Sequence, residues 1–357
     1  MDLPEKIRYL LSALGSAGYP AYVVGGCVRD TLAGREPHDW DICTAARPEQ
    51  VHAVLRDRSV RDTGLQHGTV TVILDREPFE ITTFRVDGSY SDSRHPDSVR
   101  FTDRVEEDLA RRDFTMNAMA YSPSGGLVDP FGGRADLAAG IIRCVGVPRE
   151  RFSEDTLRIL RALRFASRFS FSLHGDTAAA VHDMAPALQR IAPERIHGEL
   201  EGLLLGPDAA GVLRTFPDVI AVPIPEILPC VGFRQHSPWH LYDVWEHTLR
   251  AVAAAPADPI LRWTMLFHDL GKPSVFARDG NGVGHFYGHA QASAAMAGTI
   301  LARLRFSNDQ RDAILELVRR HDGVIPPEKK AVRRLLGRMG RAQFDRLLAV
   351  KRADNLA

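Results

Sequence analysis

The chain has 357 residues, of which 45% are apolar and 25% are charged, and its acidic and basic residues balance to a net charge of zero. This length and composition predict two or more domains with sizeable buried cores. The sequence has no long uninterrupted apolar run, so we expect neither a membrane-spanning helix nor a membrane partner. Because the net charge is zero, an RNA partner would have to be held by local basic faces.

The first part of the chain alternates between helical and extended patterns. The predicted elements, in chain order, are a helix over residues 5–17, a strand over residues 22–24, a helix from Val28 ending near Gly34, and strands over residues 39–43, 69–74 and 79–85. The last two strands are separated by a turn over residues 75–78. Together they predict an α/β head.

From Glu154 onward the pattern is helical, and Pro193 marks a helix start. A proline-rich stretch over residues 217–238 then precedes a histidine-rich helical region. The expected parts are a head over residues 1–140, a helical neck over residues 141–235 and a helical domain over residues 239–357. The predicted fold class is therefore α+β, an α/β head followed by all-helical parts.

The four cysteines, Cys27, Cys43, Cys144 and Cys230, are widely spaced and form no CxxC pair. This spacing argues against a zinc knuckle or a disulfide framework. The first residues also lack the basic-then-apolar pattern of a signal peptide. We therefore expect a reduced, cytoplasmic protein.

Two carboxylates in the head flank a tryptophan in the sequence Asp39-Trp40-Asp41. On a strand, residues i and i+2 point to the same face, so both carboxylates would converge. Such close like charges are costly unless cations hold them, and a pair of Mg²⁺ ions serves in-line nucleotidyl transfer. Glu80, on the next predicted strand, is the expected third ligand. The alternative is a solvated strand with no metal.

A strand running into Gly25-Gly26 and then into a helix that carries Arg29 and Asp30 is typical of a phosphate-binding turn. Glycines let the backbone approach the anion, helix N–H groups point at it, and the guanidinium of Arg29 adds positive charge. The alternative is a tight turn with a local Arg29–Asp30 ion pair. A phosphate site this close to two carboxylates suits a nucleoside triphosphate with its metal ions.

These motifs resemble those of the class II tRNA nucleotidyltransferases and bacterial poly(A) polymerases. The resemblance covers residues 25–30 with 39–41, 111–118, 129–133, 154–158 and 193–196, in family order. It implies a polymerase-β-like nucleotidyltransferase head, Mg²⁺ held by Asp39 and Asp41, and the addition of nucleotides from CTP and ATP to the 3′ end of tRNA.

The resemblance also implies nucleotide contacts in the third segment of the head. Asp113 and Asn117 would contact the ribose and phosphates, with Arg111 and Arg112 nearby. Taken alone, Arg111 and Arg112 fit equally well a solvated basic pair.

Asp155 and Arg158, read as i and i+3 on a helix, would present one edge together. A carboxylate accepts from the exocyclic amine of cytosine or adenine, and a guanidinium donates to the adjacent ring nitrogen. Guanine and uracil reverse both groups, at a cost of roughly 1–3 kcal/mol for each unsatisfied partner. The pair is thus predicted to select C and A, with Glu154 as a support.

The same predicted helix continues the basic face through Arg161, which we add to the nucleotide-binding set. Arg164 and Arg168 follow on that face, for which a solvated charged surface is an equal alternative. The polar segment over residues 87–96 resembles the mobile loop of family members that add the terminal A. The alternative for this segment is a plain surface loop.

The last part of the chain is rich in histidine and carboxylate side chains that can bind divalent metals. His247, His268-Asp269 and Asp354 resemble the HD-domain pattern of metal-dependent phosphohydrolases, and His289 and His321 would extend the site to two metals. The expected ion is a divalent transition metal or Mg²⁺. His285 is an alternative to His289, and a purely structural domain without metal is the alternative to both.

Four functions follow from these patterns. The first is addition of C, C and A to tRNA, and the second is a poly(A) polymerase or A-adding enzyme. The third is an HD phosphohydrolase acting on RNA ends, and the fourth is a non-catalytic tRNA-binding protein. The sequence indicates no obligate protein partner. Because residues 355–357 carry no helix stop signal, we also expect the sequence to be a piece of a longer protein.

Overall fold

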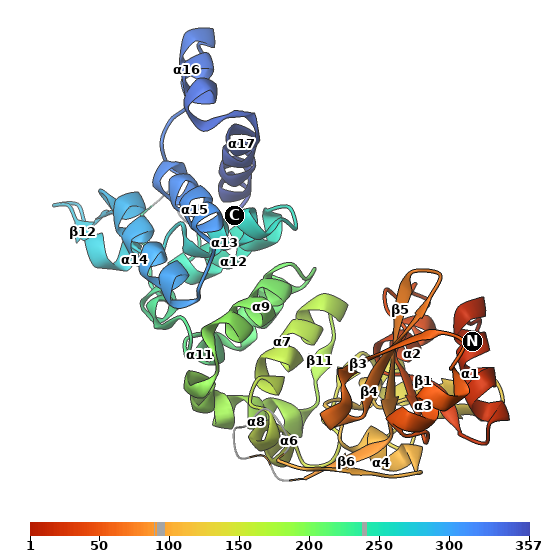
Figure 1. Cartoon of the computed structure of the whole chain (residues 1–357). Helices are drawn as coiled ribbons and strands as arrows, with labels where there is room; N and C mark the ends of the chain where they lie inside the picture. The colour runs from red at the N-terminus through yellow and green to blue at the C-terminus, as the bar shows by residue number, and fades with distance from the viewer. Residues whose placement is uncertain (89, 91–96, 238–240) are drawn as a thin grey trace. The chain divides into compact units, whose positions relative to one another are not determined.

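A computed structural model describes residues 1–88, 90, 97–237 and 241–357, and the chain forms two compact units. The first comprises Met1–Arg158 and Ser172–Ala180, and the second comprises Ile159–Phe171 and Val181–Ala357. Figure 1 traces both along the chain. None of the helices in the described residues combines the length and apolar character that a membrane crossing requires. The three-part division expected from the sequence remains a prediction.

A seven-stranded mixed sheet forms the centre of the first unit, with strand order β3-β4-β5-β2-β1-β8-β9. Its strands are β1 (Ala21–Val24), β2 (Ile42–Thr44), β3 (Ser59–Gly64), β4 (Thr69–Leu74), β5 (Glu77–Thr83), β8 (Ala120–Ser122) and β9 (Gly126–Val128). Strands β2 and β5 are parallel, whereas the other neighbours are antiparallel. The central position of β2 brings the segment before it into the middle of one sheet edge.

Helices and two small sheets complete this unit. They are α1 (Glu5–Ser16), α2 (Gly26–Leu32), α3 (Pro48–Val54), α4 (Val105–Ala110), α5 (Gly133–Ala139), α6 (Pro148–Glu154), the pair β6 (Arg85–Asp87) and β7 (Val99–Phe101), and the pair β10 (Ile141–Ile142) and β11 (Ser172–Leu173). Pairing of β11 with β10 places Ser172–Ala180 in the first unit.

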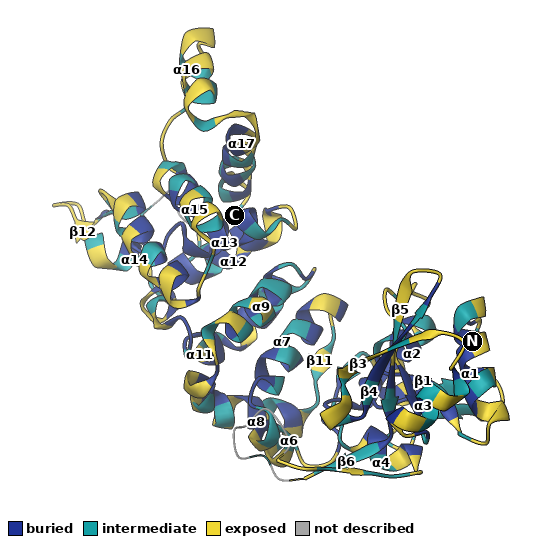
Figure 2. Cartoon of the chain, in the orientation of Figure 1, coloured by how far each residue is buried: buried dark blue, intermediate teal, exposed yellow. Residues whose placement is uncertain are grey.

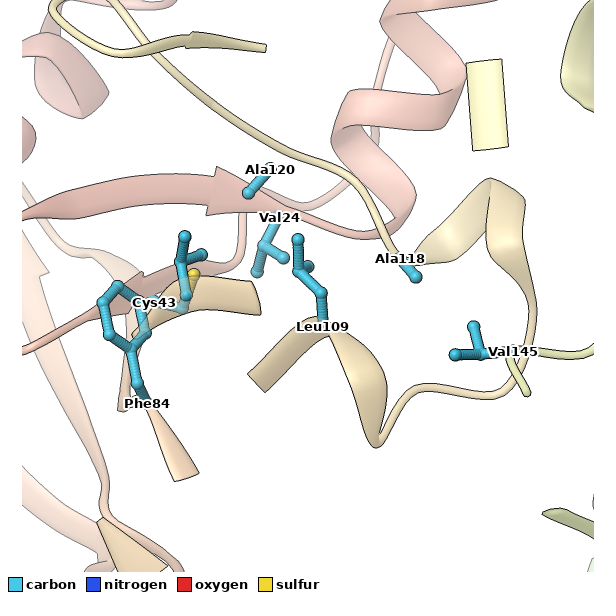
Figure 3. Packing of buried hydrophobic residues seen from close by; sticks show 8 residues of the cluster. Val24, Cys43, Phe84, Leu109, Ala118, Ala120 and Val145 are labelled. Carbon is cyan, nitrogen blue, oxygen red and sulfur yellow. The ribbon is translucent and has the colours of Figure 1, made fainter. Parts of the chain in front are cut away.

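Figure 3 shows part of the buried core of this unit. Val24, Leu109 and Ala118 belong to one cluster with Cys43 and Phe84, and all five are at most 1% exposed. Two of them adjoin polar residues in the sequence, since Asp108 precedes Leu109 and Asn117 precedes Ala118, and Val24 precedes the glycine turn. Close packing therefore fixes the backbone from which the polar side chains project.

One predicted strand has different bounds in the structure. Asp75 and Arg76 have φ values of 49° and 71°, so they form the two-residue turn that favours a right-twisted hairpin. The strand predicted over residues 79–85 therefore starts earlier, at Glu77, and ends at Thr83. Arg85 belongs to a separate strand, β6.

The second unit is helical. Its helices are α7 (Arg158–Phe169), α8 (Gly175–Met184), α9 (Pro193–Leu204), α10 (Ala209–Thr215), α11 (Pro217–Ile220), α12 (Val244–Ala254), α13 (Pro259–Phe267), α14 (His289–Arg303), α15 (Asn308–Arg320), α16 (Lys329–Met339) and α17 (Arg341–Asn355), the first two of which begin in the first unit. A two-stranded ribbon, β12 (Ala277–Arg278) and β13 (Gly284–His285), accompanies them. The predicted α+β class is confirmed.

Helix α13 is the centre of this unit, since every residue from Ile260 to Phe267 is buried. Its first turn is capped by Asp258, whose carboxylate accepts from the N–H of Leu261. Helix α12 is capped in the same way by Asp243. By contrast, α16 has no buried residue, and Figure 2 shows it without the dark blue of α13 and α17.

Candidate functional site

Three carboxylates of the head line one hollow, and the register of the sheet positions two of them. Ile42 of β2 pairs with Ile81 of β5 in a parallel ladder, so Asp41 and Glu80 occupy the next register position. The buried side chains of Ile42 and Ile81 point into the core, and the alternation of side chains therefore turns Asp41 and Glu80 outward. Asp39 lines the same hollow of about 640 Å³ as these two residues.

The DxD segment itself is not a strand, which corrects the prediction for residues 39–43. Gly25 has a φ of 77° and turns β1 into α2, so β1 ends at Val24 and offers no partner for Asp39 or Trp40. The last ladder hydrogen bond runs from the N–H of Val24 to the carbonyl of Asp41. Asp41 is thus positioned by β1 and by the register with β5, and Asp39 lies in the loop before them.

The protein around Asp41 perturbs its carboxyl group. Removal of water raises the pKa of Asp41 above its usual value, the Arg112 guanidinium lowers it, and the neighbouring Asp39 raises it again. A bound cation would relieve this repulsion, and carboxylate oxygens are the ligands that Mg²⁺ prefers. The residues present therefore fit a magnesium site held by Asp39, Asp41 and Glu80.

Arg29 lies in a buried polar network behind the glycine turn. Its guanidinium donates two hydrogen bonds of 2.9 Å to the carboxylate of Asp30 and one of 2.6 Å to the side-chain oxygen of Asn117. The amide of Asn117 in turn donates to Asp113, 3.1 Å away. The local ion pair considered as the alternative for Arg29 is thus present, and Arg29 links the turn to the segment that carries Asp113 and Asn117.

Arg111 and Arg112 are held by one fully buried carboxylate. Arg111 donates to Asp108 at 2.9 Å, and Arg112 lies 3.5 Å from the other oxygen of Asp108. A Cβ atom at Gly25 would lie 2.8 Å from the guanidinium of Arg112, so only glycine lets Arg112 lie against the turn. Burial alone would lower the pKa of Arg111, but Asp108 and Asp87 raise it, so Arg111 stays charged. The structure therefore supplies a fixed positive charge next to the turn.

Asp155 and Arg158 do not share a helix, contrary to the sequence-based argument. Helix α6 ends at Glu154, Asp155 is extended, and α7 begins at Arg158. The carboxylate of Asp155 accepts from the N–H of Leu157, as a capping residue does. A short turn separates the two helices, so the shared helical face predicted from the i, i+3 spacing does not form.

The guanidinium of Arg158 is held in place by three acceptors. It donates to the Glu154 carboxylate at 2.7 Å, to the carbonyl of Arg151 at 3.1 Å and to the carbonyl of Arg111 at 3.2 Å. Glu154 therefore supports Arg158 as expected. Arg161 belongs to the second unit, where its guanidinium lies 5.5 Å from the centre of the Phe165 ring.

The segment predicted as a loop over residues 87–96 falls mostly outside the described residues. Of the described positions, Tyr90 donates a hydrogen bond to the carboxylate of Asp87 at 2.8 Å. Burial and Asp87 raise the pKa of Tyr90.

In the second unit, the six predicted metal ligands converge in two groups. His247, His268 and Asp354 form one, and Asp269, His289 and His321 form the other, with the ligand atoms of each group within 4.8 Å of one another. Asp269 faces both groups. One of its oxygens lies 3.3 Å from His268, and the other lies 3.5 Å from both His289 and His321. These residues would therefore hold divalent cations, and Asp269 could serve either group.

Backbone carbonyls fix the orientation of three of the imidazole rings. The Nδ1 atoms of His268, His289 and His321 lie 2.7, 2.9 and 2.8 Å from carbonyls three residues earlier. Since a carbonyl only accepts, each Nδ1 carries the proton, and each Nε2 is left as the ligand atom. Such an arrangement is typical of metal-binding histidines.

Both oxygens of Asp269 are buried and lack a hydrogen bond of good geometry within the described residues. Burial would raise the pKa of Asp269, but His268 and Lys272 lower it well below its usual range. A buried carboxylate that stays ionised fits a metal ligand. Lys272, 2.7 Å from Asp269 and 3.0 Å from the Gln235 side-chain oxygen, is a polar member of the site that the sequence did not reveal.

His285 is not part of either group. Its Nε2 atom lies 3.1 Å from Asp279, on the ribbon formed by β12 and β13. His289, at the start of α14, is the histidine that joins Asp269 and His321. The choice between the two histidines left open by the sequence is therefore decided for His289.

The chain matches three family models: the poly A polymerase head domain over residues 21–143, the probable RNA and SrmB-binding site of polymerase A over residues 170–216, and the HD domain over residues 240–357. The crystal structure of the Bacillus stearothermophilus CCA-adding enzyme in complex with CTP is similar, with a TM-score of 0.71 and 33% identity, over 99% of this chain and 78% of that one. The chain belongs to the tRNA nucleotidyltransferase and poly(A) polymerase family.

Two curated members of the family are similar in sequence. The CCA-adding enzyme of Leuconostoc mesenteroides is 48% identical over 216 residues, which cover 60% of this chain and 53% of that protein. The CCA-adding enzyme of Geobacillus stearothermophilus is 43% identical over 267 residues, which cover 73% and 62%. The chain thus spans about half to three fifths of the length of these relatives.

The sequence did not reveal two supporting residues of the first unit, Asp108 and Arg151. Asp108 is fully buried and anchors Arg111 and Arg112. Arg151 and Glu154 pair with each other beside Arg158. No spacing or residue type marks such residues, because they act on other side chains that are near only after folding.

Proposed function

We propose that this chain adds cytidine and adenosine to the 3′ end of tRNA, with CTP and ATP as substrates. The observation that carries the proposal is that Asp39, Asp41 and Glu80 line one hollow at one edge of the sheet. Similarity to enzymes named CCA-adding supports it. No membrane and no obligate protein partner is part of the proposal.

Asp39, Asp41 and Glu80 would hold Mg²⁺, which supplies charge neutralisation and a more acidic 3′ hydroxyl when bound. Arg112 lies against the glycine turn, where it would attract the triphosphate. The terminal ribose hydroxyl attacks the α-phosphorus, the new phosphodiester bond forms, and pyrophosphate leaves. Asp113 and Asn117 would orient the nucleotide through the network that includes Arg29.

Base choice is proposed to depend on Asp155 and Arg158, with Arg161 as a further nucleotide contact. Glu154 and two carbonyls hold the Arg158 guanidinium before any base arrives, so its donors are already oriented. The carboxylate and guanidinium match the amine and ring nitrogen of C and A. In U and G the donor and acceptor are reversed, so the carboxylate meets a carbonyl and the guanidinium meets an N–H.

Replacement of Arg158 by alanine is expected to loosen nucleotide choice. One mismatch is worth roughly 1–3 kcal/mol, so the CTP/UTP ratio of kcat/KM should fall by about tenfold or more. Arg158→Lys should restore only part of the preference, because lysine lacks the planar fork. An unchanged CTP/UTP ratio with equal slowing for all four nucleotides would mean that Arg158 is structural.

The experiment that tests the overall activity is incorporation into tRNA transcripts that end at the discriminator base, before C, or before CC. Addition of C, C and A in order supports the proposal. If only the transcript that already carries CC is extended, and only with A, the chain is an A-adding enzyme. If A is added to all three transcripts, the chain is a poly(A) polymerase.

A second function, hydrolysis of phosphate esters at RNA ends, is favoured by the two metal-ligand groups in the second unit. Asp269 and the imidazole Nε2 atoms would hold a divalent transition metal or Mg²⁺, which supplies an activated water when bound. Assays of 2′,3′-cyclic phosphate hydrolysis with Mg²⁺, Mn²⁺, Ni²⁺ or Co²⁺, together with metal analysis, test it. If a chain that still incorporates CTP binds no metal and hydrolyses no cyclic phosphate, the second unit has only a structural role.

A further inference from the structure

A groove of about 460 Å³ lies between α15, α16 and α17 in the second unit. Its basic lining consists of Arg319 and Arg320 at the end of α15 and Arg334 and Arg338 of α16, and Val324 and Leu335 contribute apolar surface. These six residues define what we call the basic groove. None of them belongs to the two metal-ligand groups.

Most of the charge in the basic groove is uncompensated. Arg319, Arg334 and Arg338 are exposed, and no ion pair reaches them within the described residues, whereas Arg320 pairs with Glu316. Residues 319–338 contain seven arginines and lysines against two carboxylates, a net charge of +5 in a chain whose total is zero. Such a local excess of positive charge fits a polyanionic partner.

The basic groove adjoins the hollow that holds the metal-ligand groups. His321 and Asp322 line that hollow, and they lie between Arg320 and Gly323, which line the groove. The Lys351 ammonium of α17 donates to the carbonyls of both His321 and Gly323, which fixes this short segment. A ligand could therefore extend from one hollow into the other around the end of α15.

Helix α17 connects the two hollows as well. Leu347 lines the basic groove, and Asp354, seven residues later on the same face, lines the metal-ligand hollow. The two hollows thus lie along one wall about two helical turns long. At 1.5 Å per residue this wall is about 10 Å long, which suits adjacent nucleotides of a strand.

We propose that the basic groove binds the phosphate backbone of an RNA strand whose 3′-terminal phosphate lies at the two metal-ligand groups. The proposal rests on the phosphohydrolase function proposed for those groups, and it names an RNA strand as the substrate class in preference to a mononucleotide. Arginine guanidinium groups suit phosphate because they donate two parallel hydrogen bonds. The aliphatic surface of Val324 and Leu335 can cover a ribose or a base.

The distribution of residues on α16 favours RNA over a membrane surface. Ala331, Arg334, Leu335 and Arg338 lie on one face of the helix, so its groove-facing charges and apolar groups are mixed. A helix that lies on a membrane instead presents a separate, exposed apolar face. The other apolar side chains of α16, Val332, Leu336 and Met339, are half-buried.

The test compares two substrates in the full chain supplied with Mn²⁺: 2′,3′-cyclic AMP and a short RNA that ends in a 2′,3′-cyclic phosphate. The double variant Arg334→Ala/Arg338→Ala should raise KM for the RNA roughly tenfold and flatten its dependence on salt. The kcat/KM for 2′,3′-cyclic AMP should stay within about twofold of the value for the parent chain, since these arginines do not touch the metal-ligand groups. Equal loss on both substrates would overturn the proposal.

The matched control is Lys330→Ala/Arg333→Ala, which removes two positive charges from the same helix but outside the groove lining. The control should change KM for the RNA far less than the groove variant. Equal effects of the two variants would indicate general electrostatic attraction and overturn the groove assignment.

A binding measurement separates this proposal from the hydrolase function. Fluorescence anisotropy with the same labelled RNA reports the groove even if neither substrate is hydrolysed, in which case only the hydrolase function fails. A loss of RNA affinity in the groove variant beyond that in the control supports the groove. A variant that instead loses binding to phosphatidylserine vesicles, with RNA affinity unchanged, would overturn it in favour of a membrane surface.

Discussion

The carboxylates of the head lie close enough for their charges to oppose one another. Burial raises the pKa of Asp41, Arg112 lowers it, and Asp39 raises it again, so the pair is arranged for a cation. Glu77 lines the same hollow, but its carboxylate is already paired with Lys6 at 3.1 Å. This difference allows a matched comparison within one hollow.

Asp39→Ala and Asp41→Ala are each expected to reduce incorporation of both CTP and ATP by about a thousandfold, because each removes a ligand that stabilises the transition state. Glu77→Gln, in the same hollow, should have little effect. Steady-state incorporation and circular dichroism check this prediction. Turnover within about tenfold of the parent chain in either aspartate variant would contradict the metal assignment.

All four cysteines are buried, and burial raises the pKa of each thiol, to about 11 for Cys27 and about 12 for Cys144 and Cys230. Because the thiolate is the reactive form, the folded chain should react slowly with a disulfide reagent at pH 8. The protonated thiols stabilise the fold below the unfolded pKa of roughly 8.5, and this contribution is lost as the pH rises toward 11. Rapid labelling of any thiol in the folded chain would contradict the burial.

At the scale of elements, hydrophobic periodicity predicted α1, β1, β4, β5 and part of α2 in the first unit, but in the second unit it indicated only that the chain is helical. It failed at Asp155, where a local turn separates α6 from α7, and at Asp39 and Trp40, which have no strand partner because β1 ends at Val24. Strand β3, with mostly exposed and charged residues, carries no apolar alternation that would reveal it.

The candidate sites were predictable to the extent that residue type alone identifies a ligand. Histidine and aspartate in HD order indicated the six ligands, but the sequence could not choose between His285 and His289. That choice depends on the start of α14, which orients His289 toward His321. The sequence did not indicate the roles of Lys272 and Asp108, because tertiary packing brings their partners to them.

Helix α13 leads directly into His268 and Asp269, so its stability bears on both metal-ligand groups. Asp258→Ala removes the acceptor for the N–H of Leu261 and is expected to cost about 1 kcal/mol of unfolding free energy. Asp258→Asn keeps an acceptor and should stay within a few tenths of a kcal/mol. Urea unfolding of the three chains tests this, and equal losses in both variants would show that charge, not capping, is lost.

At the scale of the whole molecule, the chain consists of two compact units, each with its own buried residues and its own ligand groups. Units with separate cores can unfold in separate transitions. A ligand stabilises only the unit that binds it, by about 2.7 kcal/mol at a hundredfold excess over its Kd. Thermal unfolding can therefore assign each ligand to a unit without any assay of activity.

Mn²⁺ is expected to raise the midpoint of the transition that belongs to the second unit, and a chelator should reverse the shift. Asp269→Asn should abolish this shift because Asp269 faces both metal-ligand groups. His285→Ala, which removes a histidine outside both groups, should keep it. CTP with Mg²⁺ should instead raise the transition of the first unit, and Asp41→Ala should remove that effect. A Mn²⁺ shift that survives Asp269→Asn would contradict a metal centre built around this carboxylate.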